Sequence, residues 1–183
     1  MSEPLLVWFN GELVASAGAV SPNVNESYLL DRANSFGDGV FETLLVQRGE
    51  VVLLDRHLKR LSDGLQLLSI PCVRDKLSHD LQLIEPFIRK DENFILKIVV
   101  SRGSKVFGYS SQQTSVNRLL LLQPYTLKRV DALRLMVCET RLSIQPLLAG
   151  IKHCNRLEQV LARREVDDSG CDEGLVLDQQ GRV

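Results

Sequence analysis

The 183-residue sequence has almost no net charge and lacks a long uninterrupted apolar run. A formal net charge of −1 argues against nucleic acid or an anionic membrane surface as the main partner. The N-terminal residues show no basic segment followed by an apolar one, so the sequence predicts neither an export signal nor a membrane-spanning helix. We therefore expect a cytoplasmic protein that has no nucleic-acid or membrane partner.

The sequence also lacks the patterns of metal and nucleotide sites. Its cysteines include no C-x-x-C pair, and its histidines do not have the spacing of metal ligands (Cys72, Cys138, Cys154, Cys171; His57, His79, His153). Gly37 and Gly39 flank Asp38, but they do not form a G-x-G-x-x-G loop, and a strand pattern follows. We therefore expect no metal, no disulfide framework and no nucleotide fold, and we interpret the two glycines as a tight turn into a strand.

Hydrophobic periodicity predicts a chain that mixes strands and helices. Asn10-Gly11 lies between two apolar stretches and is typical of a tight hairpin. Leucines at positions 54, 58, 61, 65 and 68 recur at steps of four and three, which predicts an amphipathic helix that ends by Pro71. A weaker helix is expected over 74–88, interrupted near Pro86. The expected strands cover residues 6–9, 13–14, 40–47, 51–54, 94–100, 119–122, 133–138 and 174–177.

These elements form two groups, so we expect an α+β fold made of two α/β units. The first unit covers residues 1–123, residues 124–130 form a linker, and the second unit covers residues 131–183. Asp178 to Gly181 has the pattern of a type I turn, after which only two residues follow. A hairpin with one strand exposes an unpaired edge. We therefore expect the second unit to be incomplete and the chain to be a fragment.

The run from Gly150 to Leu161 has a lysine just before an expected helix. Asn155 and Glu158 have the spacing of a helix capping box. The apolar residues of the expected helix have the spacing of a buried stripe: Leu157, Val160 and Leu161. The positive end of this helix would lower the pKa of Lys152 toward that of a usable amine nucleophile. A solvated surface lysine is the alternative for any lone lysine.

Four segments carry a resemblance to a known family: Asp31–Thr43, Arg56–Leu61, Ser101–Tyr109 and Leu148–Val160. The first is similar to a motif of all class IV (fold type IV) pyridoxal-phosphate-dependent aminotransferases. The second resembles the family's helix whose arginine binds the cofactor phosphate, and the third its substrate-side loop. The fourth looks like the cofactor lysine segment of aminodeoxychorismate lyases, which belong to the same family. The lyase assignment rests mainly on this fourth segment.

The resemblance implies a reaction and two cofactor contacts. Lys152 would bind pyridoxal phosphate as a Schiff base and move protons, and Arg60 would bind the cofactor phosphate. The reaction would convert 4-amino-4-deoxychorismate to 4-aminobenzoate and pyruvate, a step of folate synthesis. A homodimer with active sites near its interface is also implied. From the residues alone, Arg60 is better explained as a surface arginine on a helix that also carries Arg56 and Lys59.

The resemblance further implies substrate contacts for Phe41, Tyr109 and Arg102. A core position for Phe41 and a turn-stabilising role for Arg102 beside Gly103 are the alternatives. Relatives often have an arginine where this sequence has Phe107, and that arginine can bind a substrate carboxylate. Phe107 is therefore a departure from the family pattern that weakens carboxylate recognition by this loop.

Two other functions stay open. A class IV aminotransferase acting on D-amino or branched-chain amino acids would use Lys152 in the same fold, and a truncated fragment would have no catalysis. The resemblance places an acidic partner of the cofactor's pyridine nitrogen shortly beyond Val183. We therefore expect residues 1–183 alone to bind the cofactor poorly and to have little or no lyase activity.

Overall fold

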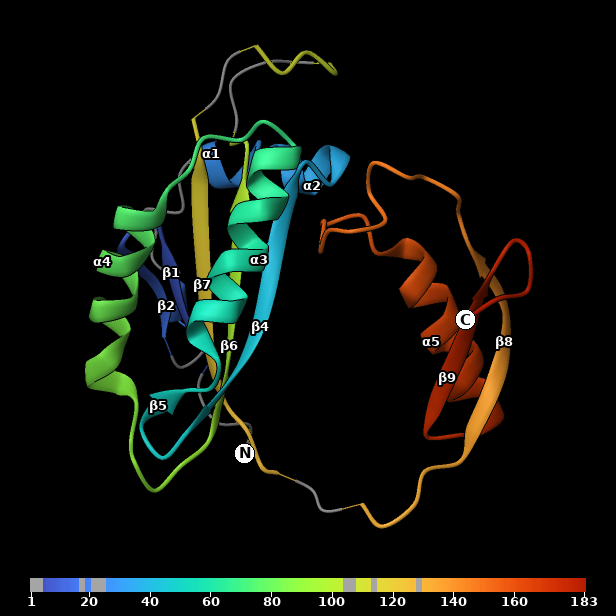
Figure 1. The fold of residues 1–183 in the computed structure, drawn as a ribbon. Helices are drawn as coiled ribbons and strands as arrows, with labels where there is room; N and C mark the ends of the chain where they lie inside the picture. The colour runs from blue at the N-terminus through green and yellow to red at the C-terminus, as the bar shows by residue number, and fades with distance from the viewer. Residues whose placement is uncertain (1–4, 17–18, 21–25, 104–107, 113–114, 128–129) are drawn as a thin grey trace. The chain divides into compact units, whose positions relative to one another are not determined.

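The computed structural model describes residues 5–16, 19–20, 26–103, 108–112, 115–127 and 130–183, which form two units (Figure 1). One unit comprises Met1–Leu127 together with Ile151–Cys154, and the other comprises Lys128–Gly150 and Asn155–Val183. The division of the sequence at 124–130 stays a prediction. The segment around Lys152 groups with the first unit although it follows the start of the second along the chain.

A seven-stranded antiparallel sheet is the centre of the first unit. Its strands, in spatial order, are β3 (Ala19–Val20), β2 (Glu12–Ser16), β1 (Leu6–Phe9), β7 (Asn117–Pro124), β6 (Phe94–Ser101), β4 (Gly39–Gln47) and β5 (Glu50–Val51). Asn10 and Gly11 connect β1 and β2 with positive φ angles of 53° and 92°, which a two-residue hairpin turn requires. The predicted hairpin and strand pairs are confirmed, although β5 is shorter than expected.

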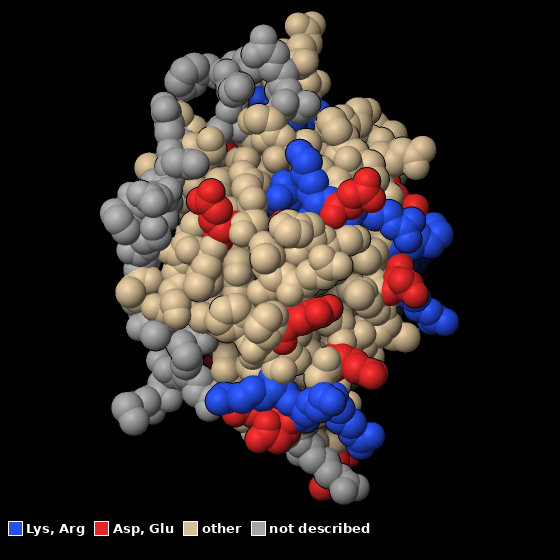
Figure 2. All heavy atoms as spheres, turned by 90° about the vertical axis from the view of Figure 1, so that its left-hand side faces the viewer, with Lys and Arg blue, Asp and Glu red and all other residues tan. Residues whose placement is uncertain are grey.

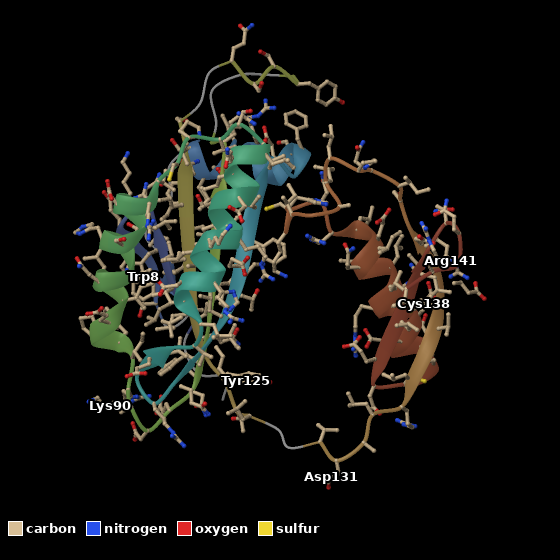
Figure 3. All side chains as sticks on the ribbon, viewed as in Figure 1. Trp8, Lys90, Tyr125, Asp131, Cys138 and Arg141 are labelled. Carbon is tan, nitrogen blue, oxygen red and sulfur yellow. The ribbon has the colours of Figure 1, made fainter. Side chains whose placement is uncertain are left out.

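Helices α3 (Leu54–Leu67) and α4 (Arg74–Ile84) cover one face of this sheet (Figure 1). Both predicted helices are confirmed: α3 ends before Pro71, and α4 continues into a 3₁₀ turn, η1 (Glu85–Phe87), at Pro86. The core between helices and sheet contains Trp8, whose ring meets that of Phe87 edge-on at 5.3 Å (Figure 3). Its other main members are Leu44, Leu61, Leu65, Leu96, Ile98, Leu120 and Leu122.

The opposite face of the sheet carries the alternate residues of the same strands, because successive side chains of a strand point to opposite sides. Phe41 on β4 pairs with Val99 on β6, and both are half-buried. Lys97, two residues before Val99, is exposed on this face. The sheet therefore presents an apolar surface with a cation in it.

Two short helices, α1 (Glu26–Leu29) and α2 (Arg32–Phe36), lead into β4. Asp31 caps α2 by accepting a hydrogen bond from the Ala33 amide, and Gly37 ends it at a positive φ of 66°. A Cβ at Gly39 would lie 2.7 Å from the Val100 carbonyl oxygen, so glycine lets β4 approach β6 here. The predicted turn into a strand is confirmed.

The second unit consists of β8 (Leu135–Leu142), α5 (Leu157–Ser169) and β9 (Glu173–Asp178). The two strands pair in parallel, and α5 packs on them. Buried Cys138, Ala162 and Val166 form its core (Figure 3). The Gly181 amide donates to the Asp178 carbonyl, which confirms the predicted turn after β9.

The predicted start and stripe of α5 are wrong. Arg156 occupies the N-cap position without a side-chain cap, and Glu158 instead accepts hydrogen bonds from the Ser143 amide and hydroxyl. Leu157 and Val160 are 70% and 60% exposed. At about 100° per residue, Ala162 and Val166, which are buried, lie on nearly the opposite side of the helix. The strands of this unit thus pack against a different face from the one that apolar spacing indicates.

Candidate functional site

The segment that carries Lys152 lies along the edge of β4. The Phe41 amide donates to the Lys152 carbonyl at 2.9 Å, and the Cys154 amide donates to the Gly39 carbonyl at 2.9 Å. Together they form an isolated antiparallel bridge between Val40 and His153. The short β5 leaves this part of β4 unpaired on that side, so the bridge satisfies backbone groups at a sheet edge. The backbone of Lys152 is thereby fixed to the strand that carries Phe41.

Helix α3 packs closely behind this bridge because it has a glycine there. A Cβ at Gly64 would lie 3.0 Å from Val40 and 3.7 Å from Ile151. Gly64 is buried in the last turn of α3, and glycine is otherwise a poor helix residue. Its small size therefore helps to place the segment before Lys152.

The ring of Phe41 has two amines beside it. The Nζ atom of Lys152 lies 4.4 Å from the ring centroid, and the Nζ atom of Lys97 lies 5.2 Å from it. Both are within the range of a cation–π interaction. A ligand with negative charge would be attracted to this place by the Lys97 ammonium group. Sequence reasoning missed Lys97, although a lysine within the apolar run of β6 could have indicated it.

Arg60 on α3 forms a fork with a buried carboxylate on β4. Its Nε and Nη2 atoms each lie 2.6 Å from an oxygen of Glu42, which is 1% exposed. The Nδ1 atom of His57 lies 2.7 Å from the same carboxylate. The Arg60 side chain is half exposed, and its Nη1 atom has no hydrogen-bond partner among the described residues. The sequence predicted Arg60 but missed Glu42, which orients it.

This carboxylate stays ionised despite its burial. Burial raises the pKa of Glu42, but the hydrogen bonds and charges of Arg60 and His57 outweigh that effect, so the pKa lies below its ordinary value. The same hydrogen bonds raise the pKa of Arg60. A negative charge therefore persists on the helix-facing side of β4, next to Phe41 in sequence but on the opposite face.

The remaining predicted site residues lie at the end of the sheet where β4 begins. Arg102 is 6% exposed, and its guanidinium donates to the Asp38 carboxylate and to the carbonyls of Leu68 and Ser69. These contacts match the turn-stabilising alternative for Arg102. Tyr109 is 87% exposed. Phe107 lies outside the described residues.

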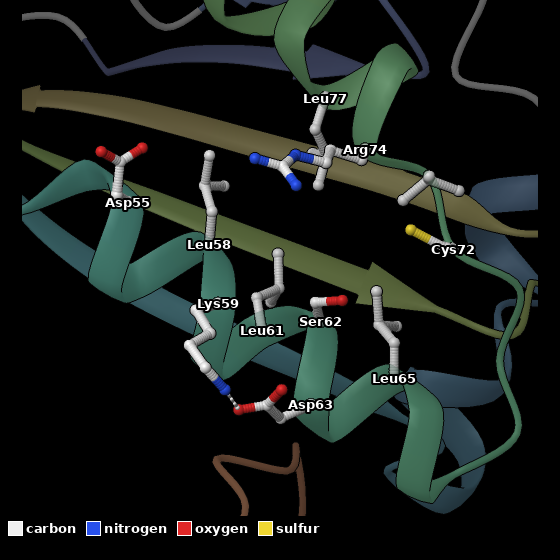
Figure 4. A pocket seen from close by; sticks show the side chains of 11 residues that line it. Asp55, Leu58, Lys59, Leu61, Ser62, Asp63, Leu65, Cys72, Arg74 and Leu77 are labelled. Atoms are coloured by element: carbon white, nitrogen blue, oxygen red, sulfur yellow. Dashed lines mark hydrogen bonds and ion pairs between the residues drawn. The ribbon is translucent and has the colours of Figure 1, made fainter.

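A surface pocket of about 420 Å³ lies between α3 and the start of α4 (Figure 4). Its apolar lining includes Leu58, Leu61, Leu65 and Leu77, with Cys72 and Arg74 among its other residues. The pocket contains neither Lys152 nor Arg60. It is therefore separate from the groups that sequence analysis selected.

The charged surface is mixed. On the face that Figure 2 shows, lysines and arginines alternate with aspartates and glutamates. Across the part of the chain that the structure describes, no group of three or more His, Cys, Asp or Glu side chains could hold a metal ion. Within the same residues, no helix is long and apolar enough to cross a membrane.

Comparisons with known proteins agree on a family. Residues 39–183 match the description "Amino-transferase class IV". The chain is 35% identical over 158 residues to an aminodeoxychorismate lyase from Vibrio harveyi, covering 84% of this chain and 58% of that protein. It is 26% identical over 182 residues to a putative branched-chain-amino-acid aminotransferase from Methanocaldococcus jannaschii, covering 97% of this chain and 61% of that one.

Solved structures show the same likeness. The crystal structure of 4-amino-4-deoxychorismate lyase from Pseudomonas aeruginosa is 37% identical and matches with a TM-score of 0.74, over 96% of this chain and 62% of that chain. A branched-chain aminotransferase from Thermoproteus uzoniensis matches with a TM-score of 0.80 at 19% identity, over 97% and 61% of the two chains. The chain thus spans about 60% of the length of these proteins.

Proposed function

Because this chain belongs to the class IV aminotransferase family, we propose that it acts as a pyridoxal-phosphate-dependent lyase that converts 4-amino-4-deoxychorismate to 4-aminobenzoate and pyruvate. The expected α+β fold is confirmed by its match to the lyase structure. Identity to the two lyases, 35% and 37%, exceeds the 26% identity to the archaeal aminotransferase. This difference favours the lyase over the aminotransferase.

The observation that carries the proposal is the fixed backbone of Lys152 on the edge of β4. An amine that must hold a cofactor needs a defined position, and the bridge to β4 supplies it. The donor set fits pyridoxal phosphate: Lys152 offers an amine for its aldehyde, and Arg60 has Nη1 available for its phosphate. Glu42 holds the Arg60 fork in one orientation.

Each group then has a defined task. Pyridoxal phosphate, when bound, supplies the electron sink for the carbanion formed at C4 of the substrate. The Lys152 amine accepts the C4 proton and later delivers a proton to the departing pyruvate enol. Lys97 attracts a carboxylate of the substrate to the Phe41 side of the sheet. Formation of the aromatic ring drives the reaction, so the protein mainly positions groups and moves protons.

Replacement of Lys152 tests the proposal in the full-length protein. Lys152→Ala should abolish both the visible absorbance of the lysine-bound cofactor and the release of pyruvate, because it removes the amine that the proposal assigns to the cofactor aldehyde. Lys59→Ala is the matched control, since Lys59 is an exposed lysine that forms an ion pair with Asp63 on α3. Pyruvate formation by Lys152→Ala at the wild-type rate would contradict the proposal.

An aminotransferase is the second candidate, because relatives with that name cover nearly the whole chain. Pyruvate and 4-aminobenzoate formed without any keto-acid acceptor would support the lyase. Amino transfer that requires a keto acid, with no 4-aminobenzoate formed, would support the aminotransferase. Comparison of residues 1–183 with a chain extended to the length of these relatives tests whether residues 1–183 alone are inactive.

The proposal includes partners and location. A small-molecule substrate follows from the lyase reaction, and a homodimer and a cytoplasmic location are proposed with it. Sedimentation of the purified full-length protein tests the dimer. A monomer with full activity would contradict it.

A further inference from the structure

Arg32, the first residue of α2, has its whole guanidinium engaged beneath a surface loop. Its side chain is 6% exposed, and its Nε atom donates to Asp38 at 2.8 Å. Its Nη1 atom donates to the Gly108 carbonyl at 2.8 Å, and its Nη2 atom lies 3.4 Å from the Tyr109 carbonyl. Arg32 therefore joins the start of β4 to a loop 76 residues further along the chain.

An aromatic contact reinforces this connection. The guanidinium carbon of Arg32 lies 4.9 Å from the centroid of the Phe36 ring, and that ring lies 5.3 Å from the ring of Tyr109. Both Arg32 and Phe36 belong to α2, so one rigid turn supports the loop at its backbone and at its ring. Tyr109 is nevertheless 87% exposed. The structure fixes the position of a side chain that it leaves almost wholly accessible.

Burial of a guanidinium is unfavourable unless its hydrogen bonds are satisfied. An exposed loop that needed only to close a strand connection would gain little from such an anchor. The anchor has value where the loop must keep a fixed distance to something else. The segment that carries Lys152 is the second partner of this distance. Asp38 immediately precedes Gly39, and the Gly39 carbonyl accepts a hydrogen bond from the Cys154 amide of that segment.

A short path thus connects the two regions. The carbonyls of Gly108 and Tyr109 bind Arg32, Arg32 binds Asp38, and Asp38 leads into the strand that carries Phe41 and fixes Lys152. All these residues belong to the first unit. The Arg32–Asp38 pair acts here together with Arg102, whose guanidinium donates to the same oxygen of Asp38, and with the Arg32 amide, which donates to the Gly103 carbonyl.

We propose that Arg32 is a positioning residue that holds the Gly108–Tyr109 segment in register with β4, so that this segment contributes substrate affinity. The identity of the substrate in this inference rests on the proposed function. The role of Arg32 in holding the loop rests on its observed contacts alone. Arg32 acts through the two carbonyls that it binds. Its loss therefore weakens substrate binding more than it slows the chemical step.

The test compares Arg32→Lys with Arg118→Lys in the full-length protein. Arg118 is a similarly buried arginine whose guanidinium binds the buried carboxylate of Asp80 on α4, far along the chain from the 108–112 segment's anchor at Arg32. Both changes keep a positive charge and remove a guanidinium fork. Any general effect of a weakened buried ion pair should therefore appear in both variants.

Arg32→Lys should raise KM for 4-amino-4-deoxychorismate about tenfold, equivalent to ~1.4 kcal/mol, and change kcat less than about twofold. The absorbance of the lysine-bound cofactor should stay unchanged. Amide hydrogen exchange over residues 108–112 should become about tenfold faster, because the local opening of the loop is easier. Arg118→Lys should change neither KM nor this exchange.

Equal effects of the two variants on KM and exchange would overturn the proposal, as would faster loop exchange with an unchanged KM. Phe36→Leu removes the ring beneath Tyr109 without touching the ion pair, and it should give the same KM and exchange pattern to a smaller extent. Phe36→Leu replaces Arg32→Lys as the test variant if Arg32→Lys does not fold. The wild-type protein could lack lyase turnover while Arg32→Lys still speeds amide exchange over residues 108–112. That result would contradict the proposed function but would support the role of Arg32 in anchoring the loop.

Discussion

Replacement of Glu42 by glutamine removes the negative charge that orients Arg60 and His57. The carboxylate accepts three short contacts, at 2.6, 2.6 and 2.7 Å, and is almost wholly buried. A glutamine has one acceptor oxygen, and its NH₂ group would face a donor of Arg60 or His57. Each lost hydrogen bond to a charged group removes about 1.5–3 kcal/mol. Because Arg60 is half exposed and regains water, we expect a total loss of about 3 kcal/mol.

Urea unfolding of the full-length protein measures this loss. Asp63→Asn is the control, since it removes an exposed ion pair with Lys59 on the same helix and should change the unfolding free energy by less than about 1 kcal/mol. A Glu42→Gln protein within about 1 kcal/mol of wild type would refute the reasoning. It would mean that the Arg60 fork is not held by this carboxylate.

The pH dependence supplies an independent check. The pKa of Glu42 is lowered in the folded protein, so its stabilisation is complete above the ordinary carboxyl value of 4.5 and decreases as pH falls through the lowered pKa. The difference in unfolding free energy between wild type and Glu42→Gln should therefore shrink below about pH 4.5. An unchanged difference down to strongly acidic pH would also refute the reasoning.

Three further changes have defined outcomes. Gly64→Val should destabilise the protein by about 1–3 kcal/mol. Gly64→Ala should be nearly neutral, because the higher helix propensity of alanine offsets the 3.0 Å contact of the added Cβ with Val40. Thermal unfolding of the two variants checks this. Gly174→Ala should destabilise the second unit by a similar ~1–3 kcal/mol, because the added Cβ would lie 2.5 Å from the Cys138 sulfur, and hydrogen exchange of β8 reports it. Lys97→Met should raise KM about tenfold (~1.4 kcal/mol) without changing cofactor absorbance; an unchanged KM would exclude Lys97 from substrate binding.

Local patterns predicted the first unit well because they act over short distances. Asn10-Gly11 accepts the positive φ angles of a hairpin turn, and the leucine spacing of α3 places Leu61 and Leu65 in the core. The same reasoning failed at α5. There the apolar stripe and the capping spacing of Asn155 and Glu158 are present in the sequence, but Glu158 binds Ser143 instead. Local spacing cannot show which face of a helix its strands will cover.

The candidate site was predicted only in part. Lys152 and Arg60 were selected by resemblance, and their roles stay predictions. Glu42 was not selected, because an acidic residue inside an apolar strand has no local signal that identifies its partner. Arg102 was selected for the substrate, yet its guanidinium is used by Asp38 and two carbonyls. Charge alone does not distinguish a ligand-binding arginine from one that holds a turn.

The sequence by itself determined the main strands, the helices α3 and α4, the hairpin at Asn10 and the presence of a lysine segment typical of one family, but not β3, α1 or α2. Only the tertiary structure decided that residues 151–154 return to the edge of β4, and that Arg32 connects α2 to Gly108. Turns and amphipathic helices depend on neighbours within a few residues. Pairing across some 110 residues, as between Val40 and His153, depends on which backbone groups the rest of the sheet leaves unpaired, and no local pattern contains that information.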